Sequence, residues 1–121
     1  MRTFIVGMII VMVLGLTGCS SPIEFNGKSE NWSVTCSVDQ SANVKSFLIR
    51  YTGKENQPVK DTSYSFVDSK NFNNSGKSEA SSATLKISGK STMDTPYVDE
   101  AAFKLHIKWN GKEETIDLAR D

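Results

Sequence analysis

Three side chains in this chain stand out for covalent chemistry: the thiols of Cys19 and Cys36, and the imidazole of His106, its one histidine. A thiol can carry a lipid, form a disulfide or act as a nucleophile, and an imidazole can act as a general base. Cys19 directly follows Gly18 at the end of a long apolar run. Cys36 and His106 stand instead in segments where apolar and polar residues alternate. These settings predict different roles for the two thiols.

The apolar run before Cys19 has the pattern of an export signal. It extends from Phe4 to Leu16 without a charge, Arg2 precedes it, and small residues follow it. Its 13 residues are fewer than the roughly 20 that a membrane-spanning helix needs. An uncleaved anchor or a buried helix is the alternative, but a buried helix would have no amphipathic partner elsewhere in the chain.

The residues Leu16-Thr17-Gly18-Cys19 resemble the lipobox of bacterial lipoproteins. That resemblance implies cleavage after Gly18 and a diacylglycerol thioether on Cys19, with the membrane as partner and no other cofactor. Ser20 follows, not the aspartate associated with retention at the inner membrane of Gram-negative cells. The mature part is similar to small, uncharacterised Gram-positive lipoproteins that end in a Trp-Asn-Gly-Lys hairpin, here Trp109–Lys112. This second resemblance implies no known activity or site residue.

The predicted signal divides the chain into three parts. Residues 1–18 form the signal peptide, 19–29 the lipidated cysteine with a short linker, and 30–121 one β-sandwich domain. The 103 residues that remain after cleavage can fold without a metal or a disulfide. Ile23 and Phe25 alternate with polar residues, so a short edge strand is the alternative for that part of the linker.

The charge of the mature chain is nearly balanced. Loss of Arg2 leaves 13 basic residues against 14 acidic ones. Without a basic excess to neutralise phosphates, nucleic acid is not an expected partner. Without a polybasic patch for anionic lipid, membrane attachment must come from the lipid on Cys19.

Beyond residue 30 the hydrophobic period is two, which predicts strands. In residues 31–39, Cys36 lies on the apolar face. A buried thiol there behaves as a small hydrophobic side chain, and without a nearby cation or base it stays protonated. Because Cys19 is assigned to the lipid, no Cys19–Cys36 disulfide is expected. Similar alternation predicts further strands at 46–52, 59–67, 83–88 and 101–109 and after Gly111, with loops at 53–58 and 89–96.

The last hairpin carries the strongest local signal. Asn110-Gly111 directly follows a long alternating run and favours a two-residue type I′ turn. Folding the chain back there pairs Leu105 with Ile116 on the apolar face and Lys108 with Glu113 on the polar face.

The strand pattern, without any helical period, predicts an all-β fold. Six strands, or seven with Ile23–Phe25, favour an immunoglobulin-like antiparallel β-sandwich of six to seven strands. A small β-barrel is the alternative.

The other reactive groups lack the neighbours of a catalytic or metal site. His106 is expected to face solvent opposite Thr115, flanked by lysines, without the nucleophile and orienting acid of a triad. Asp94, Asp99 and Glu100 could meet a calcium ion from one side, but they lack the alternating oxygen ligands and glycine of a calcium loop. The prediction is therefore no catalytic residue and no metal.

Two loops supply the predicted contact surface. Residues 68–82 form a polar connection of fifteen residues, a length typical of binding loops or of disorder. Phe72 within it is either a contact residue at the tip or a side chain that packs back on the domain. Tyr97, beside Pro96 in a second loop, is the other candidate contact residue.

The sequence thus predicts a lipoprotein anchored by its lipid to the extracytoplasmic face of the cell membrane of a Gram-positive cell. Its domain is not an enzyme, and it binds a small ligand or an envelope protein, or assists an assembly. Two other classes stay open. One is an exported enzyme with a loop-assembled site that includes His106 and Asp94, and the other is a structural or inhibitory subunit of an envelope complex that docks through a sheet edge.

Overall fold

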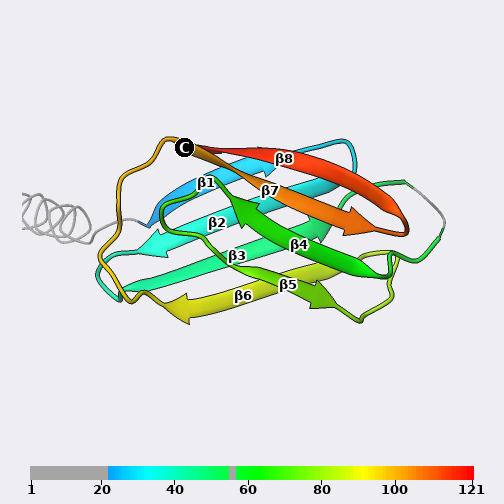
Figure 1. Cartoon of the computed structure of the whole chain (residues 1–121), viewed down its shortest axis with the longest axis horizontal. Coiled ribbons are helices and arrows are strands. Elements are labelled where there is room, and N and C mark those ends of the chain that lie inside the picture. Colours follow the sequence, from blue (N-terminus) through cyan, green and yellow to red (C-terminus); the bar gives the residue numbers. More distant parts are fainter. Residues whose placement is uncertain (1–21, 55–56) are drawn as a thin grey trace, which may run out of the picture.

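The computed structural model describes residues 22–54 and 57–121, which form eight antiparallel strands and no helix (Figure 1). The strands are β1 (Ile23–Lys28), β2 (Trp32–Asp39), β3 (Val44–Tyr51), β4 (Thr62–Val67), β5 (Ser75–Ser78), β6 (Lys86–Thr92), β7 (Ala102–Trp109) and β8 (Lys112–Arg120). They belong to one sheet in the order β5-β4-β7-β8-β1-β2-β3-β6. The all-β prediction is confirmed, and the nearly closed, barrel-shaped sheet fits the small-barrel alternative.

Side chains, rather than backbone hydrogen bonds, close the barrel between its two edge strands. β5 and β6 stand at opposite ends of the strand order. Across the gap, the Phe47 ring of β3 lies 5.5 Å from the Tyr64 ring and 5.3 Å from the Phe66 ring of β4, measured between centroids. Such aromatic pairs stabilise by about 0.5–1.5 kcal/mol beyond their burial.

The alternation of each strand puts its apolar residues inside the barrel. In β2 every second side chain is buried, and Cys36 is one of them, as predicted. β7 and β8 contribute Leu105, Ile107 and Ile116, all fully buried. Each side chain of this kind contributes about 1.5–3 kcal/mol on burial, so the core accounts for the fold without a cross-link.

The predicted hairpin is confirmed in turn and register. Asn110-Gly111 joins β7 to β8 with φ angles of 48° and 76°, as a type I′ turn requires. Leu105 lies opposite Ile116, and Lys108 lies opposite Glu113. The side chain of Asn110 also accepts a hydrogen bond from the Lys60 backbone N–H at 3.0 Å, which ties the turn to the loop before β4.

Two predicted loops contain strands. The predicted connection 68–82 includes β5, whose Ser-Gly-Lys-Ser sequence has no apolar residue and whose strand conformation comes from pairing with β4. The predicted loop 89–96 is wrong up to Thr92, because β6 continues along β3 as far as Val44. Neither β5 nor the part of β6 after Ser88 shows the apolar alternation on which the prediction relied.

The first strand begins at Ile23, inside the range 19–29 that the sequence assigns to a linker. β1 pairs with β2 over its whole length and with β8 at Phe25 and Asn26, so it is an interior strand and not an edge. With β1 and β5 included, the sheet has eight strands instead of six to seven.

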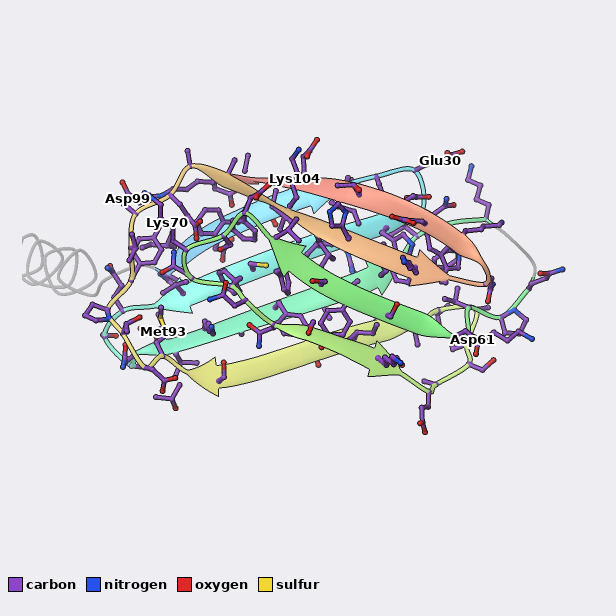
Figure 2. All side chains as sticks on the ribbon, viewed as in Figure 1. Glu30, Asp61, Lys70, Met93, Asp99 and Lys104 are labelled. Atoms are coloured by element: carbon purple, nitrogen blue, oxygen red, sulfur yellow. The ribbon has the colours of Figure 1, made fainter. Side chains whose placement is uncertain are left out.

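The barrel has two ends with different loops (Figure 1). The terminal end carries the start of β1, residue 121 and the loops 40–43, 68–74 and 93–101. The hairpin end carries the Asn110-Gly111 turn and the loop residues 29–31, 52–54, 57–61 and 79–85. Figure 2 shows Lys70, Met93 and Asp99 at the terminal end and Glu30 and Asp61 at the hairpin end.

Candidate functional site

Phe72 belongs to the core and not to the surface. Its side chain is fully buried and stacks on Phe103, with ring centroids 5.3 Å apart and planes 18° apart. Phe25 and Phe66 contact the same ring. The packing alternative therefore holds, and a ring enclosed on several sides by aromatic neighbours cannot be a contact residue.

Tyr97 is half-buried at the margin of the core, in the loop between β6 and β7. Its hydroxyl donates to Asp99 Oδ1 at 3.4 Å, and the Arg120 guanidinium pairs with the same carboxylate. Partial burial raises the pKa of the Tyr97 hydroxyl. The neighbouring Val98 is 45% exposed, so this part of the loop is accessible to a partner. A contact role for Tyr97 stays a prediction.

A polar cluster joins the loops 68–74 and 93–101. The Asn71 amide, in a side chain only 5% exposed, donates to Val98 O at 2.7 Å and to Glu100 Oε2 at 2.6 Å, and it accepts from the Val98 N–H at 2.9 Å. The Ser69 hydroxyl also donates to Glu100 Oε2, at 2.8 Å. The cluster holds the two loops together at the terminal end and engages the Glu100 carboxylate in hydrogen bonds.

The residues considered for catalysis and calcium binding are not brought together. His106 lies in the middle of β7 with Nδ1 2.8 Å from Thr115 Oγ1, whereas Asp94 lies in a terminal-end loop. In residues 22–54 and 57–121, no three His, Cys, Asp or Glu side chains are grouped as a metal ion would require. The same residues contain no helix of the length and apolarity needed to span a membrane.

The two cysteines differ in what the structure describes of them. Burial, with a smaller contribution from the Glu100 carboxylate, raises the pKa of the Cys36 thiol far above its ordinary range. Cys36 is therefore a protonated core residue and not a nucleophile. Cys19 and the predicted cleavage site at Gly18 lie outside the described residues.

The hairpin end holds an open pocket of about 700 Å³ over an aromatic cluster. Its lining residues are Glu30, Asn31, Thr52, Gly53, Lys54 and Lys112. Behind it the rings of Trp32, Tyr51 and Trp109 pack with centroids 5.2 to 6.4 Å apart. These three side chains are 7% exposed or less, and their hydroxyl and indole N–H groups have no hydrogen-bond partner in the described part of the chain.

Trp32, Tyr51 and Trp109 stand at apolar positions of alternating segments, so their burial follows from the sequence, but the sequence does not identify the pocket beside them. The lining residues come from three separate loops whose meeting depends on the barrel. The one local signal is Gly53, which stands two residues after Tyr51, the last residue of β3.

Comparison with protein-family models, with curated protein sequences and with solved structures finds no match for this chain. The candidate site is therefore argued from its own geometry.

Proposed function

We propose that the protein is a lipoprotein of the cell envelope, anchored to the extracytoplasmic face of a Gram-positive cell membrane by a diacylglycerol on Cys19. Its barrel binds a ligand or an envelope protein and does not catalyse a reaction. The observation that carries the proposal is the Leu16–Cys19 motif at the end of an apolar run with a single preceding arginine.

The position of β1 supports a barrel that is anchored with its terminal end near the membrane. β1 starts at Ile23, four residues after Cys19. At roughly 3.4 Å per residue, those residues span at most about 14 Å. A lipid on Cys19 would hold the terminal end close to the bilayer, and the hairpin end with its pocket would point away from it.

The surroundings of the reactive side chains support a binding role. The Cys36 thiol is buried and protonated, and His106 contacts a threonine hydroxyl. A nucleophile–base pair also needs a third group that orients the base. His106 lies 2.8 Å from the Thr115 hydroxyl, but the hydrogen bonds of the described residues give it no acid that would orient the imidazole.

The anchor is tested by labelling with radioactive palmitate in a Gram-positive host. The wild-type chain is expected to incorporate label, and Cys19→Ser is expected to incorporate none. Cys36→Ala is the matched control, because it removes the other of the two cysteines and should label like wild type. Equal labelling of Cys19→Ser and wild type would refute the anchor.

A further inference from the structure

The hairpin end keeps buried polar groups that the fold does not use. The described residues contain five buried side-chain atoms that lack a hydrogen-bond partner. Four of them lie at this end: Trp32 Nε1, Tyr51 Oη, Thr62 Oγ1 and Trp109 Nε1. Thr62 lines a second pocket at this end, with Lys60 and Asp61. Since roughly 90% or more of buried polar groups in proteins are hydrogen-bonded, the concentration of such groups at the hairpin end calls for a reason.

The Tyr51 hydroxyl lies directly behind the pocket wall. A Cβ atom at residue 53 would stand 2.3 Å from this hydroxyl oxygen and 2.6 Å from Asn31 Oδ1, so both atoms occupy the space that a side chain at Gly53 would fill. Asn31 Nδ2 is engaged by the Glu114 carboxylate. Gly53 has no side chain, so its backbone alone lies over the hydroxyl on this side. A ligand in the pocket would reach the hydroxyl only after a small shift of residues 52–54.

The groups around the pocket define the chemistry of a ligand. The Tyr51 hydroxyl is a buried donor, and two lysines, Lys54 and Lys112, are among the residues that line the pocket. A hydroxyl donor with cations beside it suits an oxygen that carries negative charge. Glu30 and Asn31 Oδ1 offer acceptors for hydroxyl or amino groups elsewhere on the same molecule.

We propose that this pocket binds a small ligand through an oxyanion, a carboxylate or a phosphate, which accepts a hydrogen bond from Tyr51 and is paired with Lys54. The ligand completes the hydrogen bonding of a tyrosine that the folded chain leaves unsatisfied. Only the outward orientation of the pocket rests on the proposed function, since the binding chemistry does not require a lipid on Cys19.

The chain supplies its own probe of binding. Its two tryptophans, Trp32 and Trp109, both contact the Tyr51 ring. The full-length chain, purified in detergent, is titrated with sodium phosphate, sodium acetate or glycerol at constant ionic strength while tryptophan emission is recorded. A saturable change with phosphate or acetate, and none with neutral glycerol, is expected. The stronger of the two anions identifies phosphate or carboxylate as the recognised group.

Two variants and two matched controls locate the binding. Tyr51→Phe and Lys54→Gln should each weaken anion binding about tenfold or more. Tyr64→Phe makes the same chemical change at the β5–β6 gap, and Lys90→Gln removes an exposed charge from β6, so both should bind like wild type. Lys54→Gln changes an exposed side chain and keeps the test valid if Tyr51→Phe alters folding.

The proposal is overturned if no anion gives a saturable change, or if Tyr51→Phe and Lys54→Gln both bind like wild type. Palmitate labelling of the same preparations separates this result from the anchor. A chain that labels on Cys19 but binds no anion refutes the pocket alone, and a chain that binds but does not label refutes the anchor alone.

Discussion

At the terminal end of the barrel, the buried amide of Asn71 is hydrogen-bonded through both its nitrogen and its oxygen, whereas at the hairpin end the buried hydroxyl of Tyr51 has no partner in the described residues. The terminal end has one exception, Asn74 Oδ1. A satisfied buried group holds loops together, while an unsatisfied one costs stability. The contrast supports the proposal that the unsatisfied buried groups at the hairpin end, unlike Asn71, are kept for binding.

The largest expected effect is at the terminal end. Phe72→Ala should lower the free energy of unfolding by about 3–5 kcal/mol, because it empties a ring-sized space beside Phe103 and Phe25. Urea unfolding followed by tryptophan emission measures this loss. Asn73→Ala, at the exposed next residue, should change little. A loss below about 1 kcal/mol for Phe72→Ala would mean that the ring is not a core residue.

Asn71→Ala should cost somewhat less, about 2–4 kcal/mol. It leaves the Val98 N–H and part of the Glu100 carboxylate without partners. The urea midpoint of unfolding is expected to fall while the m-value stays unchanged. If the variant unfolds like wild type, the terminal end is not sealed by this cluster and the contrast between the two ends disappears.

Cys36 lies in the middle of the barrel, between the two ends, and its thiol makes stability depend on pH. Burial raises the pKa of the Cys36 thiol above its ordinary 9.0, so the unfolded chain loses this proton first as the pH rises. The thiol's contribution is therefore fully present below about pH 9 and falls above it by at most about 1.4 kcal/mol per pH unit. Urea unfolding at about pH 8 and pH 10 should show this decline in wild type. A Cys36→Ala chain that declines equally would contradict the prediction.

The smallest effect has the opposite sign and belongs to the hairpin end. Without ligand, Tyr51→Phe should raise the free energy of unfolding by about 1 kcal/mol, because it removes a buried hydroxyl that has no partner. Thermal unfolding of the variant and wild type, with Tyr64→Phe as control, measures the gain. A loss of stability would show that the hydroxyl serves the fold, and the two ends would then be alike.

The strands that could be predicted from sequence are those in which apolar and polar residues alternate. Trp32 to Asp39 and the final hairpin alternate strictly, which predicts them as strands, and the Asn110-Gly111 turn fixes the register of the hairpin. β5 could not be predicted, because Ser75–Ser78 is a strand only through its pairing with β4. Closure of the sheet depends on contacts such as Phe47 with Tyr64, which join residues far apart in the chain.

The candidate site was less predictable for a related reason. Tyr51 can be assigned to a buried face from its strand, but whether its hydroxyl finds a partner depends on where Asn31 and Gly53 lie in three dimensions. Phe72 shows the same limit, since a lone aromatic in a polar segment fits both a surface and a core role until its neighbours are known.

The interior position of β1 also has a mechanical consequence. β1 pairs with β2 from Ile23 to Lys28 and with β8 at Phe25 and Asn26. A pulling force on the chain before Ile23, resisted at the hairpin end, acts along this strand and loads its hydrogen bonds together in shear. An edge strand pulled across its axis would instead unzip one bond at a time. The barrel is thus built to withstand tension applied from the side on which the chain enters.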